Sequence, residues 1–176
     1  MRPLNLNTIL WIVTTILILF ALYLIFAWVP TEASMDIVER IFYFHVPSAW
    51  SAFLAFFVVF IFSIAYLAKR DMKWDTLAYC SAEIGLAFTS LALISGSIWA
   101  KPICGNWWLW DDPRLTSTLV LWLIYAGYLM VRNYSSSNQA SRFAAVIGIA
   151  GFIDVPIVYL SVQLWRSGHP LVLGQT

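Results

Sequence analysis

The sequence predicts an all-α protein, a polytopic membrane helix bundle with five transmembrane helices. Of its 176 residues, 61% are hydrophobic and only 11% are charged. A soluble domain carries roughly 25% charged residues, so this chain has too few of them to cover a water-exposed surface. Five apolar runs are also long enough to cross about 30 Å of hydrocarbon at about 1.5 Å per residue. These observations together exclude an ordinary soluble domain.

The five apolar runs cover residues 8–29, 46–68, 77–100, 115–131 and 143–164. The first run follows Arg2 and in that respect looks like a signal peptide. It is longer than the apolar region of a signal peptide, however, and no small-x-small cleavage site follows Trp28. We therefore expect a retained helix. No internal repeat and no polar linker divides the chain, which predicts a single membrane domain over residues 1–176.

Basic residues in the connections predict the orientation of the helices, because cytoplasmic loops carry an excess of Lys and Arg. Six basic residues fall on one face: Arg2, Lys69, Arg70, Lys73, Arg132 and Arg142. We expect this face and the N-terminus to be cytoplasmic, in a cell's inner membrane. The loops at residues 30–45, 100–114 and 165–176 then lie outside. The net charge of +1 and the lack of a basic run give no reason to expect nucleic acid as a partner.

The first outer loop is itself patterned. Asp36 and Glu39 have the spacing of a capping box, and Ile37, Ile41 and Phe44 follow at helical spacing. A short amphipathic helix in the membrane interface is predicted there. Pro47 restricts the residue before it and favours a first helical turn, so we expect a break at this point. His45 would then lie at the outer mouth of the second transmembrane helix.

The segment 99–114 is the most unusual part of the chain. It contains four of the ten tryptophans, namely Trp99, Trp107, Trp108 and Trp110. Tryptophan normally belts both membrane interfaces, but here seven map near the outer face and only Trp11 and Trp74 near the inner one. An interface belt accounts for some of them. Flat indole rings also suit contact with a large planar macrocycle, which the excess on one face favours.

Both histidines, His45 and His169, fall on this outer face. Neutral imidazole is a common iron ligand, and two imidazoles at separate helix ends are able to bracket a porphyrin. The alternative is two interfacial histidines with no shared role.

Basic residues give an independent indication, because the orientation rule disfavours them on the outer face. The four that occur there lie close to the histidines or the tryptophans: Arg40, Lys101, Arg114 and Arg166. A ligand with two carboxylates, such as haem with its propionates, would pair with such groups. Pairing with the acidic residues of the same loops is the alternative for each of them.

Two carboxylates fall inside the apolar runs. Asp154 precedes Pro156 by two residues, and Glu83 lies near the cytoplasmic end of its run. A carboxylate inside a membrane span often has a functional role. A helix kink at Asp154-Val-Pro accounts for Asp154, however, and we favour structural roles for both residues. The chain has no motif of a hydrolase or a P-loop protein, so we expect no enzyme activity. Cys80 and Cys104 fall near opposite membrane faces and are not expected to pair.

The combination of motifs resembles the CcmC family, haem-handling membrane proteins of cytochrome c maturation, which share a tryptophan-rich WWD loop with CcsA-type proteins. The resemblance covers nearly the whole chain in order: HVPSAW (45–50), GSIWAKP (96–102), GNWWLWD (105–111), RLTS (114–117) and DVPIVY (154–159). Cys104 stands where family members usually have Trp, and the Asp111–Arg114 segment is one residue longer than usual. The family usually has a sixth helix after the second histidine, whereas this sequence stops at Thr176, so we expect a fragment or a short variant.

The resemblance implies haem b, bound without a covalent link, at the outer face. His45 and His169 would be the axial iron ligands, and the loop from Trp107 to Asp111 would contact the edge of the macrocycle. It also implies transfer of haem to the chaperone CcmE, with the ABC-type proteins CcmA and CcmB and the small CcmD as further partners. Two alternatives stay open. One is a b-type haem or quinone redox subunit, and the other is a haem-free assembly scaffold.

Overall fold

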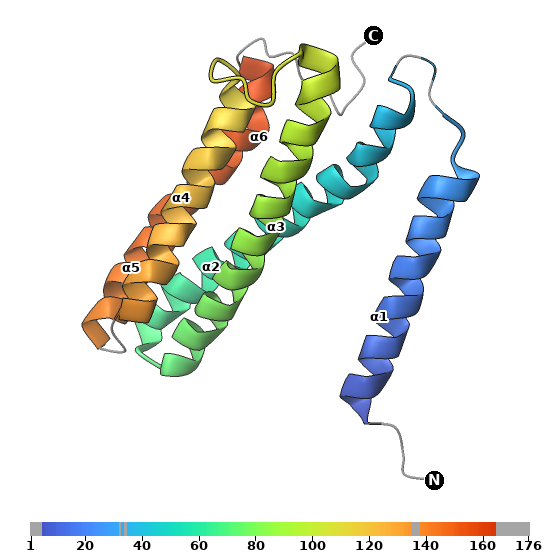
Figure 1. Ribbon diagram of the computed structural model, residues 1–176. Coiled ribbons are helices and arrows are strands. Elements are labelled where there is room, and N and C mark those ends of the chain that lie inside the picture. Colours follow the sequence, from blue (N-terminus) through green and yellow to red (C-terminus); the bar gives the residue numbers. More distant parts are fainter. Residues whose placement is uncertain (1–4, 32, 34, 135–137, 165–176) are drawn as a thin grey trace. The chain divides into compact units, whose positions relative to one another are not determined.

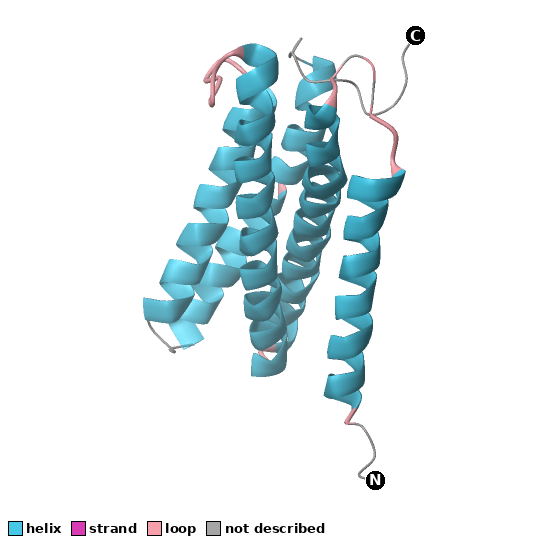
Figure 2. Cartoon of the chain, turned by 45° about the vertical axis from the view of Figure 1, so that its right-hand side comes forward, coloured by secondary structure: helices cyan, strands magenta, loops and turns pink. Residues whose placement is uncertain are grey.

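The computed structural model describes residues 5–31, 33, 35–134 and 138–164, with the backbone alone at 162–164. Within these ranges all regular secondary structure is helical apart from one isolated bridge residue, as Figures 1 and 2 show. The elements in chain order are α1 (Leu6–Tyr23), η1 (Leu24–Trp28), η2 (Ile37–Ile41), α2 (Phe42–Lys69), α3 (Met72–Cys104), α4 (Pro113–Tyr134), α5 (Asn138–Phe152) and α6 (Asp154–Leu164).

The predicted fold class is confirmed: the chain is an all-α, multi-pass membrane protein. Five helical segments are long and apolar enough to cross a membrane, and each overlaps one of the five predicted runs. They are Leu6–Trp28, Ile37–Lys69, Met72–Cys104, Pro113–Tyr134 and Asn138–Ser161. The helices are longer than the apolar runs, because polar residues at the ends continue the helical backbone.

The predicted start of the second span was wrong. The capping box does not form, because Asp36 has φ 52° and its side chain makes no capping hydrogen bond. A 3₁₀ turn, η2, runs directly into α2, which continues through His45 and Pro47 without a break. Proline costs little in the first turns of a helix, where few backbone N–H groups have intrahelical partners. Ser48 also donates its hydroxyl to the carbonyl of Phe44 at 2.7 Å, which satisfies an acceptor there.

The chain forms two compact units, Met1–Tyr43 and Phe44–Thr176. In the first unit, Asn5 caps α1 by accepting a hydrogen bond from the backbone N–H of Asn7 at 3.1 Å. None of the side chains of α1 is buried. The mean hydropathy of Leu6–Trp28, 2.8, is that of a helix able to cross the hydrocarbon of a membrane.

The second unit is a helix bundle in which α3 and α4 lie side by side and α5 and α6 pack against α4 (Figure 1). Its centre is the stacked pair Phe56 on α2 and Tyr125 on α4, whose ring centroids are 3.7 Å apart. Gly85 of α3 makes room for Phe56, since a Cβ there would come within 2.4 Å of the phenyl ring. Close helix packing at small residues is typical of membrane bundles, and it fixes α3 against α2 and α4.

The last predicted run, 143–164, is two helices. The turn at Ile153 separates α5 from α6, and Asp154 begins α6 with Pro156 in its first turn. The predicted kink at Asp154-Val-Pro is therefore confirmed, and its cause is the proline, which suits a first helical turn. The two cysteines are free thiols, as expected, and lie 24 residues apart on one helix.

Candidate cofactor site at the tryptophan loop

We call residues 105–112, which connect α3 to α4, the tryptophan loop. The first turns of α2, the last turns of α3 and the start of α4 lie at this end of the second unit, which Figure 2 shows at the top. Helix α6 reaches it too, because the rings of Trp50 on α2 and Tyr159 on α6 have centroids 5.9 Å apart. Four helices therefore surround the loop end of the bundle.

His45 is held against α3 by Ser95. Nδ1 of the imidazole lies 3.0 Å from the Ser95 hydroxyl oxygen, and both side chains are half-buried. The Ser95 hydroxyl donates its own proton to the Leu91 carbonyl at 2.7 Å. With its proton on that carbonyl, the Ser95 oxygen is able to accept from Nδ1–H, and the tautomer that donates in this way has its lone pair on Nε2. A neutral imidazole in this tautomer is suited to ligate a metal through Nε2.

Gly96 gives the His45 ring the space that it occupies. A Cβ at position 96 would lie 3.2 Å from Cε1 and 3.6 Å from Nδ1 of the imidazole. The glycine follows Ser95 directly, so one short stretch of α3 supplies both the hydrogen bond and the clearance. The ring thus lies close against the α3 backbone.

The end of α3 shapes the tryptophan loop. Gly105 adopts φ 79° and donates its N–H to the Lys101 carbonyl at 3.1 Å, the left-handed ending that favours glycine. The Lys101 ammonium donates to the Gly105 carbonyl at 2.8 Å and lies 6.0 Å from the centroid of the Trp107 ring. Lys101 therefore fastens the start of the loop and contacts the first loop tryptophan.

The four tryptophans of this segment differ in exposure. Trp99 is buried, with 6% of its surface exposed, so it packs inside the bundle. Trp107 and Trp110 are 58% and 74% exposed. Trp108 is half-buried, its ring centroid lies 5.6 Å from that of Trp110, and its buried indole Nε1 has no hydrogen-bond partner among the described residues. The loop therefore presents two exposed indoles and one unused indole donor.

The first turn of α4 carries the other end of the loop. Asp112 is 5% exposed and accepts a hydrogen bond from the Leu115 N–H at 3.0 Å, so it caps α4. Asp111, the acidic residue singled out from the sequence, is exposed instead. Arg114 is half-buried and close enough to Asp112 for electrostatic attraction. The Thr116 hydroxyl donates to the Trp110 carbonyl at 3.1 Å, which ties the loop to α4.

Of the predicted site residues, Lys101 contacts Trp107 and Trp108 contacts Trp110, and Arg114 lies in the first turn of α4 directly after this loop. Trp99 is buried in the last turns of α3, and His45 lies against Ser95 and Gly96 of the same helix. Asp111 lies in the same loop with an exposed side chain. His169 and Arg166 lie outside the described residues, as does the predicted outer loop 165–176. Arg40 belongs to the first unit, where it donates to the Phe26 carbonyl at 3.1 Å and lies 5.8 Å from the Phe26 ring centroid.

The sequence analysis did not assign a role in the site to three residues: Ser95 and Gly96, which hold the His45 ring, and Asp112, which caps α4. Ser95 lies four residues before Trp99, on the same side of α3, and that spacing was an available signal. The partner of Ser95, however, is 50 residues away in the chain. No local pattern identifies such a pair.

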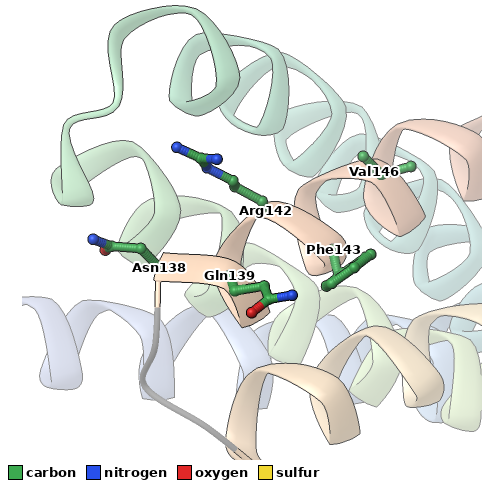
Figure 3. A pocket seen from close by; sticks show the side chains of 5 residues that line it. All are labelled: Asn138, Gln139, Arg142, Phe143 and Val146. Atoms are coloured by element: carbon green, nitrogen blue, oxygen red, sulfur yellow. The ribbon is translucent and has the colours of Figure 1, made fainter.

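The arrangement provides one well-oriented imidazole, exposed aromatic rings and basic groups. It is not a closed metal site, since no cluster of three or more His, Cys, Asp or Glu side chains occurs in the part of the chain that the structure describes. A metal held here would have most of its coordination supplied by another group, as a porphyrin supplies it to iron. A separate pocket at the start of α5, lined by Asn138, Gln139, Arg142, Phe143 and Val146, lies at the other end of the bundle and has neither a histidine nor a tryptophan in its lining (Figure 3).

The fold and the site define a multi-pass membrane protein with a histidine and a tryptophan-rich loop at one end of its helix bundle. The sequence matches the family described as "CcmC: Heme exporter protein C" over residues 4–171. The chain belongs to this family.

Curated relatives named "Heme exporter protein C" share about a third of their residues with the chain. The protein of Bradyrhizobium diazoefficiens is 37% identical over 90% of the chain and 61% of its own length. That of Escherichia coli K12 is 35% identical over 82% of the chain and 59% of its own length. That of Rhodobacter capsulatus is 30% identical over 90% of the chain and 66% of its own length. The chain thus spans about three fifths of the length of the first two relatives.

Proposed function

We propose that the chain binds haem b non-covalently at the outer face of the inner membrane and passes it on during cytochrome c maturation. The observation that carries the proposal is the His45 imidazole, which Ser95 and Gly96 hold at the tryptophan-loop end of the bundle. The family name points to haem as the ligand. When bound, haem supplies an iron that takes imidazole as an axial ligand.

His45 and His169 are the two proposed axial ligands. His169 follows Leu164, the last residue of α6, by five positions, and five residues span at most about 18 Å. Helix α6 contacts α2 through Tyr159 and Trp50, five residues beyond His45. The second histidine is therefore within reach of the same end of the bundle.

The tryptophan loop is proposed to contact the macrocycle. Trp107 and Trp110 present exposed rings, and each aromatic contact adds about 0.5–1.5 kcal/mol beyond buried area. The Trp108 Nε1–H is a donor without a described acceptor, which a propionate would supply. Trp99 is buried, so it would support the tryptophan loop from within the bundle and not contact the macrocycle. Asp111, in the same loop, would lie at the polar rim.

Four basic residues are proposed to attract the propionates: Arg40, Lys101, Arg114 and Arg166. Arg114 is the strongest of them on structural grounds, because it is half-buried beside the tryptophan loop. A partly buried guanidinium binds a carboxylate more strongly than an exposed one does, since less solvent screens the pair. Lys101 has the loop carbonyl of Gly105 as a partner already.

The proposed orientation places the N-terminus in the cytoplasm and the tryptophan loop outside. Basic residues gather at the opposite end of the bundle, where Lys69, Arg70 and Lys73 join α2 to α3. The proposed partners are a haem chaperone of the CcmE kind on the outer side, and CcmA, CcmB and CcmD within the membrane. The activity is transfer of a cofactor and not catalysis. It requires the protein to hold haem reversibly.

The test is the optical spectrum of the full chain purified from haem-replete cells. We expect a Soret band in the parent, and its loss or displacement in His45→Ala and in His169→Ala. A parent without a Soret band overturns the proposal and leaves the scaffold as the better explanation. Haem bound equally well by both variants overturns the ligand assignment.

A second experiment tests the proposed haem contacts of Trp110 and Arg114, each with a matched control. Trp110→Ala should weaken haem retention, whereas Trp11→Ala, whose indole is equally exposed on α1, should not. Arg114→Ala should weaken it too, whereas Arg142→Ala at the start of α5 should not. If both members of a pair behave alike, that contact with haem is rejected.

A further inference from the structure

We infer that Ser95 is a positioning residue that fixes the tautomer and the orientation of His45. The inference deepens the proposed function and rests on it, because it concerns the residue proposed to ligate haem iron. The two side chains come from α2 and α3 and meet at 3.0 Å.

The argument begins with the single proton of the Ser95 hydroxyl. The backbone of α3 offers that proton two acceptors, the Leu91 carbonyl at 2.7 Å and the Ala92 carbonyl at 3.2 Å. A serine in a helix commonly donates to such carbonyls. With its proton so committed, the oxygen is an acceptor toward His45, so Nδ1 carries the hydrogen and Nε2 the lone pair.

The same contact restricts how the ring is able to turn. Ser95 is fixed by its own bond to α3, and the missing Cβ of Gly96 leaves the imidazole the room that it occupies beside this helix. Rotation of the ring away from α3 breaks the Nδ1–H···Oγ bond, and rotation by 180° brings a ring carbon toward the acceptor. The preferred orientation therefore exists before any ligand arrives, which lowers the ordering cost of binding.

The chemistry of the acceptor also has a consequence. Metal-bound histidines usually donate the other ring N–H to a carboxylate, a carbonyl or water, and the partner sets the basicity of the ligand. A neutral hydroxyl is a weaker acceptor than a carboxylate. Ser95 therefore orients His45 without making it a strongly electron-donating ligand, which suits a site that must release haem.

The first test needs no haem. In the His169→Ala background His45 is the only histidine, so ¹⁵N shifts of labelled imidazole report its tautomer directly. We expect protonated Nδ1 in the haem-free parent background. In Ser95→Ala we expect a mixture with more Nε2–H. Protonated Nε2 as the main form in the parent background overturns the inference, whatever the result with haem.

The second test uses the haem-loaded full chain. Second-shell changes cost about 10- to 100-fold in metal affinity, so Ser95→Ala should lower haem affinity by about 10-fold and raise the midpoint potential. Ser95→Thr keeps the hydroxyl and should restore both. Ser90→Ala is the matched control, because Ser90 also donates to a carbonyl four residues back, at 2.8 Å, and accepts a ring N–H, from Trp122 at 2.8 Å. A merely structural serine role predicts equal effects at both positions.

A double-mutant cycle separates the two proposals. If Ser95 acts through His45, Ser95→Ala has no further effect on haem affinity in the His45→Ala background. If the parent binds haem but Ser95→Ala and Ser90→Ala have the same haem affinity and midpoint potential, only the role of Ser95 is overturned. A parent without haem overturns the haem site and, with it, the positioning of an iron ligand.

Discussion

Arg132 on α4 donates from Nε to the Asp75 carboxylate on α3 at 2.8 Å, and its Nη2 contacts the same oxygen. Ser141 on α5 donates to that oxygen as well, at 3.2 Å. Asp75 is only 2% exposed. One buried carboxylate thus joins three helices at the end of the bundle opposite the tryptophan loop, where it fixes α3 relative to α4.

Arg132→Ala should therefore destabilise the protein. Removing one partner of a buried ion pair leaves an uncompensated charge and costs about 3–5 kcal/mol. The measurement is the unfolding free energy in mixed detergent micelles. Lys73→Ala is the control, because its ion pair with Asp71 at 2.9 Å is solvent-exposed and should contribute at most about 1 kcal/mol. Equal loss in the two variants would contradict the buried role of Asp75.

The sequence predicted the membrane spans well because hydrophobicity over some twenty residues is a local property. Helix ends were less predictable. Lys101 and Pro102 look like the end of a helix, yet α3 continues to Cys104 and stops at the left-handed Gly105. At His45 the predicted break is wrong, since a proline early in α2 costs little.

The candidate site was predictable in its residue types but not in its contacts. Histidine, tryptophan and arginine stand out against an apolar sequence, so His45, Trp110 and Arg114 could be named as candidates. Ser95 does not stand out, because a serine in a membrane helix normally bonds its own backbone. Its role toward His45 depends on how α2 and α3 pack, and that packing depends on contacts such as Gly85 with Phe56.

Asp112→Ala should lower stability by about 0.5–2 kcal/mol, because the Asp112 side chain caps α4 at the Leu115 N–H. It should also loosen the tryptophan loop and weaken haem retention. Asp111→Ala is the neighbouring control, since Asp111 is exposed and the capping bond does not depend on it. Thermal unfolding in detergent and the Soret absorbance measure the two effects. A larger effect at Asp111 would indicate direct ligand contact there.

Asp71 should make stability depend on pH at the start of α3. Its side chain accepts from the Lys73 N–H at 3.0 Å, and its pKa lies below the ordinary 3.8, chiefly because of the hydrogen bond from the Lys73 side chain. A lowered pKa in the folded state stabilises the protein above pH 3.8, and this contribution is lost as the pH falls through the folded pKa. Asp71→Asn keeps the cap but does not titrate, so its unfolding temperature should fall less between about pH 6 and pH 3. An identical fall in both proteins would exclude Asp71 as a contributor.

Gly96→Ala should weaken haem binding without harming insertion or folding. The added Cβ would lie 3.2 Å from Cε1 of His45, closer than ordinary van der Waals contact, so the ring must shift away from residue 96 by a few tenths of an ångström. Because this shift disturbs the geometry of the hydrogen bond that orients the imidazole, haem affinity should fall by roughly 10-fold. Gly127→Ala is the matched control: nothing lies within 4 Å of its added Cβ, and alanine in a helix interior should raise stability by about 0.5–1 kcal/mol. Titration of the detergent-purified variants with haem measures the affinity, and unfolding measures the stability. Gly96→Ala with parental affinity would show that the place of His45 against α3 does not limit binding.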